Sequence, residues 1–286
     1  MTKLKELFEN IADAIRFKDG TSELIYAENF AQKIKDIQTY EKEFHGMVER
    51  TIERLANDKI STIYPYNFAD FTYLKSVDFP NVTKVGERAF SNCSGLTSIE
   101  LKNAGGTIGA YAFSNCPKLI SVNLPKATFL DSYAFNYCLK LASINLPNVT
   151  ELGARAFVYC SSLSNIILPQ ATSIREYAFM TCSNLVSVNM PKVARLYTYV
   201  FQNCKSLTTL VLGNNTKLCS LSNVNAFNST PIASGAGYIY VPQALIEDYK
   251  TATNWVTCAN QFRAIEDYID EIKEIFPDFE YEEVEA

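Results

Sequence analysis

A phenylalanine returns at a nearly constant interval through the middle of this 286-residue chain, and this period restricts the fold more than any other feature. The interval is 22 or 23 residues over seven phenylalanines, and an eighth follows after 26 residues. A period in this range is the signature of a repeat architecture, in which each unit packs mainly on its neighbours. The phenylalanines are Phe68, Phe90, Phe113, Phe135, Phe157, Phe179, Phe201 and Phe227.

Each phenylalanine belongs to a longer motif. An alanine usually precedes it, a leucine lies six residues after it, and a Ser-Ile-x-Leu segment follows that often ends in proline. A cysteine lies three residues after the phenylalanine in six consecutive units. These cysteines are Cys93, Cys116, Cys138, Cys160, Cys182 and Cys204. The unit reads (Val/Ala)-Thr-x-(Ile/Leu)-x-x-x-Ala-Phe-x-x-Cys-x-x-Leu-x-Ser-Ile-x-Leu-Pro, and a motif of this length does not recur by chance.

The motif predicts one short strand and one tight turn in each unit. The Ile and the last Leu lie two residues apart, so they share one face of a strand, and the proline after them ends it. The Phe and Cys lie three residues apart, which places both on the inner side of a single helical turn. One unit cannot bury its apolar side alone, whereas stacked units form a continuous core. The sequence therefore predicts an open solenoid with a parallel sheet and an inner ladder of Phe and Cys.

The chain divides into three parts. Residues 1–57 have apolar residues at helical spacing and are expected to form a helical hairpin that caps the first coil, or a separate docking or oligomerisation module. Residues 58–242 hold about eight repeats. Residues 243–286 are expected to form a C-terminal helical cap, with a helix over Gln243 to Thr253, and an acidic tail. Phe262, Ile265, Ile269, Ile272 and Phe276 continue at helical spacing, and Pro277 to Ala286 is expected to be frayed.

The repeat unit resembles the leucine-rich repeat family, in particular its BspA-like branch. Members of that branch carry Ala-Phe-x-x-Cys-x-x-Leu followed by a Ser-Ile-x-Leu-Pro strand, and the likeness here covers about Ile60 to Pro242. BspA-like proteins are often bacterial surface or secreted proteins implicated in adhesion and host-protein binding. The resemblance therefore implies a binding role, although the core residues that define the repeat are not the surface residues that choose a partner.

A second, shorter resemblance concerns the N-terminal part. The stretches Ile11 to Arg16 and Ala27 to Ile37 look like a short helical module of phage and prophage virion proteins from gut bacteria. This resemblance implies a protein that is carried on a virion. Such a protein would need no secretory signal, and residues 1–10 lack the apolar stretch of one. The expected location is therefore the bacterial cell surface or a virion.

Composition excludes several classes of function. The 26 Lys and Arg against 31 Asp and Glu give a net charge of -5 without a basic block, so we expect no nucleic-acid partner. No apolar run approaches the roughly 18 residues of a membrane-spanning helix, so we expect no membrane insertion. His45 is the single histidine, and it lies in a charged, solvated stretch. We therefore expect no metal site, no cofactor and no enzymatic activity, with a carboxylate-based hydrolase as the remote alternative.

The eight cysteines follow the period of the coils and contain no Cys-x-x-Cys pair. We expect the six ladder cysteines to be reduced and buried as small hydrophobic residues. Their side chains would run parallel on successive coils, which does not suit a disulfide. Cys219 and Cys258 lie outside this ladder.

Two places depart from the motif. Lys102 replaces the usual proline, and an extra residue follows near Gly105 and Gly106. The last unit is longer, from Gly213 to Asn225, and its strand is expected at Ile239 to Val241.

The motif also predicts which residues point outward. Two columns follow the strands, and they are either a soluble outer side or a platform for a peptide or glycan. They are Ser76, Ser98, Ser121, Ser143, Asn165, Ser187 and Thr209, and Asp78, Glu100, Asn123, Asn145, Ile167, Asn189 and Val211. A third column flanks the Ala-Phe turn, where tyrosine and arginine would either contact a partner or stack between coils. It contains Arg88, Tyr111, Tyr133, Arg155, Tyr177 and Tyr199, with Asn92, Asn115, Tyr137, Tyr159, Thr181 and Asn203 beside it.

These patterns favour a non-catalytic binding or adhesion module whose partner is a protein or a glycan. The candidate binding residues are Tyr111, Tyr133, Tyr177, Tyr199, Arg88, Arg155, Asn123, Asn145 and Asn189. The alternative is a phage or prophage structural or assembly protein that docks through its N-terminal helices. The first function predicts that Tyr133→Ala with Tyr177→Ala abolishes binding while the fold is retained. The second predicts that deletion of residues 1–57 abolishes self-association or particle incorporation.

Overall fold

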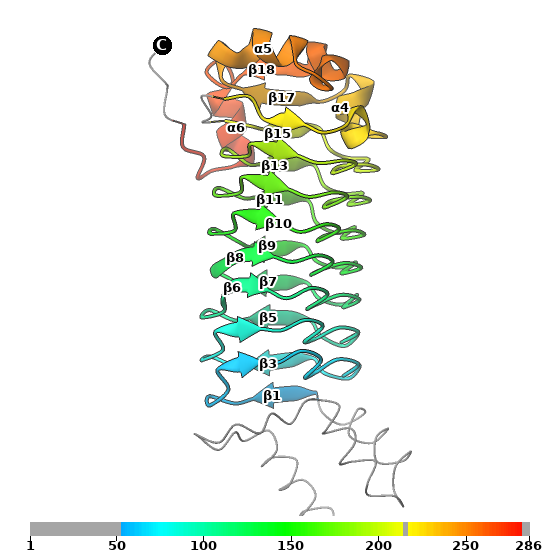
Figure 1. Cartoon of the computed structure of the whole chain (residues 1–286), viewed down its shortest axis with the longest axis vertical. Helices are drawn as coiled ribbons and strands as arrows, with labels where there is room; N and C mark the ends of the chain where they lie inside the picture. Colours follow the sequence, from blue (N-terminus) through cyan, green and yellow to red (C-terminus); the bar gives the residue numbers. More distant parts are fainter. Residues whose placement is uncertain (1–52, 214–216, 282–286) are drawn as a thin grey trace, which may run out of the picture.

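The computed structural model describes residues 53–213 and 217–281, which form one elongated stack of coils (Figure 1). Each coil lies on the previous one, and the strands of adjacent coils pair in parallel. The predicted leucine-rich repeat solenoid with a C-terminal helical region is therefore confirmed. The helices expected before residue 53 lie outside the described residues.

One side of the stack is an eight-stranded parallel sheet, with one strand from each coil. The sequence analysis expected a single strand per unit, and that expectation was wrong. The Thr-x-(Ile/Leu) segment before each Ala-Phe also alternates, so that Ile174, for example, points inward and Ser173 lies toward solvent. The strands are β2 (Thr62–Ile63), β4 (Lys84–Val85), β6 (Gly105–Ile108), β8 (Lys126–Leu130), β10 (Glu151–Leu152), β12 (Ser173–Ile174), β14 (Arg195–Leu196) and β16 (Ser220–Leu221).

The opposite side carries the strands that the motif predicted. Equivalent residues pair from coil to coil, as Ser98, Ser121 and Ser143 do, so the repeat period itself sets the register. The strands fall into sheets of two, three and five strands along the stack. They are β1 (Arg54–Ala56) and β3 (Ser76–Asp78); β5 (Ser98–Glu100), β7 (Ser121–Asn123) and β9 (Ser143–Asn145); and β11 (Asn165–Ile167), β13 (Ser187–Asn189), β15 (Thr209–Val211), β17 (Tyr238–Val241) and β18 (Phe262–Ala264).

The Ala-Phe segment is a series of tight turns rather than the expected helical turn. Its backbone reaches the left-handed region twice in each of the coils from Phe68 to Phe201, as at Tyr111 (φ 56°) and Asn115 (φ 57°). Phe113 and Cys116 nevertheless both point into the core and are fully buried. The phenylalanine rings stack from Phe68 to Phe227, with centroids 5.1–5.6 Å apart. The turn thus aligns like residues of successive coils.

The six ladder cysteines contribute a hydrogen bond as well as volume. Each thiol donates to the carbonyl oxygen of the phenylalanine in the preceding coil, at 3.0–3.2 Å. All eight cysteines of the chain are buried and free, including Cys219 and Cys258. Burial raises the pKa of five ladder thiols, those of Cys93, Cys138, Cys160, Cys182 and Cys204. These five thiols are therefore protonated donors in the folded state.

The departures from the motif have local structural effects. At the extra residue near Gly105, the register of β6 against β8 shifts between Gly106 and Thr107, and Gly106 has a φ of +65°. In the long last unit, η1 (Val224–Phe227) and α4 (Pro231–Ser234) precede the strand β17, which begins at Tyr238, one residue earlier than predicted.

The C-terminal region closes the upper end of the stack. Here η2 (Gln243–Leu245), α5 (Ile246–Thr251) and η3 (Trp255–Gln261) lie beyond the edge strand β16. The Tyr249 hydroxyl accepts a hydrogen bond from the Cys219 amide (2.9 Å), and the Trp255 indole donates to the Cys219 carbonyl (2.7 Å). These side chains satisfy backbone groups that an open sheet edge would expose.

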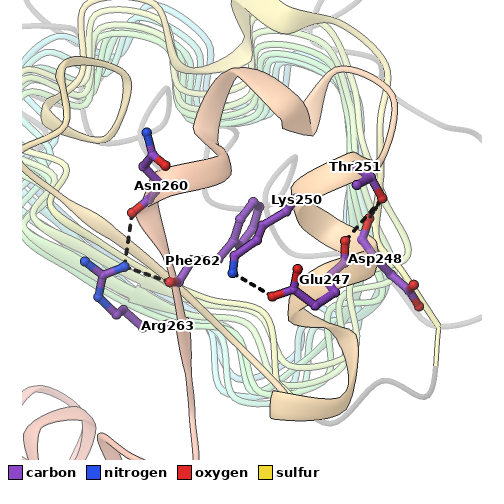
Figure 2. A network of polar contacts seen from close by, with 7 residues as sticks. All are labelled: Glu247, Asp248, Lys250, Thr251, Asn260, Phe262 and Arg263. Carbon is purple, nitrogen blue, oxygen red and sulfur yellow. Dashed lines mark hydrogen bonds and ion pairs between the residues drawn. The ribbon is translucent and has the colours of Figure 1, made fainter.

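Polar contacts organise the surface of this closing region. Lys250 forms an ion pair with Glu247 at 2.7 Å, and the Thr251 hydroxyl donates to the carbonyls of Glu247 and Asp248 (Figure 2). Arg263 donates to the carbonyls of Asn260 and Phe262. The first set of bonds lies within α5, and the bonds of Arg263 stabilise the junction between η3 and β18.

Two expectations for the C-terminal part were wrong. Phe262 was expected in a helix, but it begins the strand β18, because its backbone pairs with Ile239 of β17. Phe279 was expected in a frayed tail, but it is buried with Ile272 and Phe276 of α6 (Ile269–Ile275) and its C-terminal extension. The acidic composition of this segment indicated a solvated tail, whereas its phenylalanines are buried.

The buried thiols predict a specific loss of stability at alkaline pH. In the unfolded chain the thiols ionise above about pH 8.5, whereas in the fold their raised pKa keeps them protonated. Stability is therefore unaffected below pH 8.5 and falls as the pH rises above it, by about 1.4 kcal/mol per pH unit for each such thiol. Urea unfolding between pH 7 and pH 10.5 measures this dependence.

A matched variant separates the contribution of the thiols to this pH dependence from that of lysine and tyrosine side chains, which also titrate in this range. Cys138→Ala with Cys160→Ala should show a shallower fall above pH 8.5 than the parent chain. Equal slopes for the two proteins would contradict the assignment.

Candidate binding surfaces

The outward residues of β3, β5, β7, β9 and β11 form an exposed surface that we call the serine face. Its serines and asparagines lie one above another at the strand spacing. Asn145 donates to the side-chain oxygen of Asn123 (2.9 Å), and Asn123 donates to the Glu100 carboxylate (3.2 Å). The Lys102 ammonium and the Asn123 amide lower the pKa of Glu100. Candidate residues Asn123 and Asn145 thus belong to one hydrogen-bonded ladder.

The serine face ends before the stack does. The sequence analysis placed Ser187, Asn189, Thr209 and Val211 on the exposed surface, but all four are buried. Val211 contacts the cluster of Ile272, Phe276 and Phe279, which lies outside the solenoid core. The chain after β18 turns back over the outer side of the last strands (Figure 1). Candidate residue Asn189 is therefore covered in this structure, unlike Asn123 and Asn145.

The third predicted column forms a continuous stack, which we call the tyrosine–arginine column. Arg88 lies over the rings of Tyr66 (5.6 Å) and Tyr111 (4.7 Å), and the Tyr111 ring stacks on Tyr133 (4.5 Å). Arg155 lies over Tyr133 (5.5 Å) and Tyr177 (4.5 Å), whose ring stacks on Tyr199 (5.2 Å). The structure thus brings together six of the candidate residues.

The geometry of this column limits what it can contact. Tyr111, Tyr133 and Tyr177 have neighbours on both ring faces, so only ring edges and hydroxyls face solvent. Every member has a left-handed backbone, with φ from 50° to 62°. A bulky residue in this region carries strain, which the stacking offsets. Sugar recognition through an aromatic ring face is not open to these three tyrosines.

A second column lies beside the tyrosine–arginine column, and the type of side chain in it varies along the stack. It contains Asn92, Asn115, Tyr137, Tyr159, Thr181 and Asn203. Near the N-terminal end it is polar, because Asn115 donates to Asn92 (2.9 Å) and Asn92 donates to Asp70 (2.7 Å). Further on, the Tyr137 and Tyr159 rings stack at 4.5 Å. Tyr137 has no second aromatic partner among the ring contacts of the described chain and is 44% exposed. This tyrosine is more accessible to a partner than Tyr133 or Tyr177.

Exposed apolar side chains also occur on the middle coils of the stack, on strand β11, on the segments that lead into the strands and, at Tyr137, on the Ala-Phe turn. Sequence reasoning missed Ile120, Leu139 and Val186 as candidates. The sequence did contain a signal for Ile120 and Val186. The same repeat position holds a small or polar residue in other coils, namely Thr97, Ala142, Ser164 and Thr208. We call the following set the central patch: Ile120, Tyr137, Leu139, Ile167 and Val186, which are 40–50% exposed and lie on four consecutive coils.

Two further features are absent from the part of the chain that the structure describes. Over 53–213 and 217–281, no group of three or more His, Cys, Asp or Glu side chains is arranged to hold a metal ion. Within the same ranges, no helix is long and apolar enough to cross a membrane.

The comparisons with known proteins agree with this architecture. The family model described as the BspA type leucine-rich repeat region (6 copies) matches residues 35–160 and 128–235. These matches cover most of the chain. The chain therefore belongs to the BspA type leucine-rich repeat family.

One solved structure shows the same fold at low identity, and a second is similar over part of the chain. A leucine-rich repeat protein of T. pallidum is 23% identical, with a TM-score of 0.51, over 74% of this chain and 91% of that one. A leucine-rich repeat protein of Eubacterium ventriosum is 22% identical, with a TM-score of 0.42, over 63% of this chain and 43% of that one. No curated protein matches the sequence.

The contacts within the tyrosine–arginine column predict a loss of stability when Arg155, one of its two arginines, is replaced. Arg155→Ala deletes two cation–π contacts and the 2.8 Å hydrogen bond from Arg155 to the Tyr133 hydroxyl. We expect the free energy of unfolding to fall by about 1–2 kcal/mol, measured by urea unfolding. Lys118→Ala, which removes an exposed lysine, is the control and should change it by less than about 0.5 kcal/mol. An effect of Arg155→Ala no larger than that of the control would show that the stacking adds nothing to stability.

Proposed function

We propose that this protein is a non-catalytic binding module that presents the serine face and its central patch to a protein or glycan partner. The observation that carries the proposal is that four consecutive coils each expose a tyrosine or aliphatic side chain. The tyrosine–arginine column, by contrast, makes most of its contacts within itself. Exposed apolar groups rimmed by polar ones are typical of interaction sites.

The chemistry of the face supports two classes of partner. The side chains of Ile120, Leu139 and Ile167 would be desolvated by a protein surface that is apolar at its centre and polar at its rim. The amides of Asn123 and Asn145 retain donors and acceptors that suit peptide groups or sugar hydroxyls. Neither use requires a metal or a cofactor. Adhesion to another cell is the form of this function that the likeness to BspA proteins implies.

The tyrosine–arginine column has a supporting role in this proposal. Its stacked rings fix the spacing of the coils and so the spacing of the serine face beside them. Loss of binding in Tyr133→Ala with Tyr177→Ala would therefore need a stability measurement beside it, because both substitutions interrupt the stack. Substitutions in the central patch, which is exposed, test binding more directly.

The test is a binding screen with a matched pair of variants. The full chain is probed against immobilised host extracellular proteins and a glycan array, and the hits are quantified by surface plasmon resonance. Ile120→Ser with Leu139→Ser should weaken binding at least tenfold, because it removes exposed apolar contacts without touching the core.

Tyr73→Ser with Val256→Ser is the control pair. Both residues are exposed, at 44% and 58%, and lie outside the central patch, so binding should be unchanged. Equal binding by the two variants would contradict the assigned surface. A screen without any hit would count against the binding function itself.

The alternative function, docking into a virion through N-terminal helices, depends on residues 1–57, of which only 53–57 are described. It stays a prediction, and its test is the deletion of this segment followed by measurement of self-association and particle incorporation.

A further inference from the structure

A small hydrophobic cluster lies outside the solenoid core, on the outer side of the last strands. Ile272, Phe276 and Phe279 contribute to it from residues 268–281, a segment that we call the strap. Val211 and Tyr240 contribute from the outward positions of β15 and β17. The strap therefore packs on the same side of the solenoid that further down forms the serine face.

The covered strands have the same chemistry as the exposed ones. β13 reads Ser-Val-Asn over Ser187–Asn189, and β7 reads Ser-Val-Asn over Ser121–Asn123. The outer residues of β7 are accessible, whereas Ser187 is 0% exposed and Asn189 is 5% exposed. This polar pair is buried on the strand next to β15, whose Val211 packs against the strap.

One polar atom of this buried pair has no hydrogen-bond partner among the described residues. The Asn189 side-chain oxygen is buried and has no hydrogen-bond partner within the described part of the chain. A buried polar atom without a partner costs about 1–3 kcal/mol, and this cost disappears when the atom meets water or a ligand. Ser187, by contrast, donates to Asn165 at 2.7 Å. The orphaned amide oxygen makes the covered state of β13 less stable than a fully paired one.

The strap is held by polar contacts and by a small apolar cluster. Tyr281 donates to the Glu266 carboxylate (2.6 Å), which also accepts from the Gln243 amide (2.9 Å). The apolar anchors of the strap belong to the outer cluster and not to the continuous core of the coils. A segment with a separate small cluster can detach while the remaining structure stays folded.

We propose that the strap is a reversible cover, and that the serine face continues beneath it through β13 and β15. Opening returns Ser187, Asn189, Thr209 and Val211 to the surface, so the strap and the partner compete for the same strands. The competition rests on the proposed binding function. The opening itself does not, and it can be measured without any partner.

A single engineered thiol reports the opening. The eight native cysteines are buried, so Asn189→Cys places one thiol beneath the strap, and Asn145→Cys places a matched thiol on the exposed part of the same column. Both variants of the full chain are labelled with a thiol reagent, 5,5′-dithiobis(2-nitrobenzoate), at pH 8. We expect Asn189→Cys to react at least tenfold more slowly than Asn145→Cys, yet much faster than the native thiols.

Two results would overturn the proposal. If Asn189→Cys reacts only as fast as the native thiols, the strap opens only when the coils unfold. If it reacts as fast as Asn145→Cys, the strap does not cover the face in solution. Adding Ile272→Ser with Phe279→Ser to the Asn189→Cys chain should accelerate its labelling at least tenfold and leave that of Asn145→Cys unchanged. An unchanged rate at Asn189→Cys would likewise refute the role of these anchors.

The competition is tested with the hits of the binding screen. The Ile272→Ser, Phe279→Ser chain should bind such a protein or glycan at least tenfold more tightly than the parent, and equal affinity would refute competition. If the screen yields no hit, the proposed function fails while the labelling result still decides whether the strap opens.

Discussion

The solenoid depends on one constraint: each repeat residue must lie directly over its equivalent in the preceding coil. Backbone hydrogen bonds between coils enforce this alignment on both sides of the stack, as in the pairing of Ser173 with Arg195 and of Ser187 with Thr209. Like residues are therefore forced together. A side chain is acceptable at a repeat position only if it can stack on itself or on a complementary neighbour.

This constraint explains the unusual choices of the repeat. Phenylalanine stacks on phenylalanine, and cysteine is small enough for the interior while its thiol still bonds the carbonyl of the preceding turn. Tyrosine in a left-handed turn would be strained alone, but in a column it gains contacts on both faces. Arginine serves the same column because its planar guanidinium stacks on rings, and it separates Tyr133 from Tyr177 without interrupting the stack.

The repeat period was sufficient to predict the solenoid, its inner ladder and the outward columns, because these follow from residues 22 or 23 positions apart. The second sheet was also encoded, in the Thr-x-(Ile/Leu) alternation, but a two-residue strand is too short for a pattern to be separated from a turn. The strand β18 and the burial of Phe279 could not be derived in this way. They depend on contacts between non-repeating segments, and no periodic signal marks such contacts.

The same constraint indicates where recognition can reside. In a regular column such as the stacked tyrosines, each side chain already contacts its equivalents in the neighbouring coils, and few of its interactions remain for a partner. Exceptions to the period behave differently. Ile120 and Ile167 interrupt polar columns and leave apolar surface exposed, and Asn189 continues a polar column beneath an apolar strap and leaves an oxygen unpaired. These sites have unmet interactions at fixed positions on a rigid scaffold, so selection for a partner would act on the departures from the repeat rather than on the repeat.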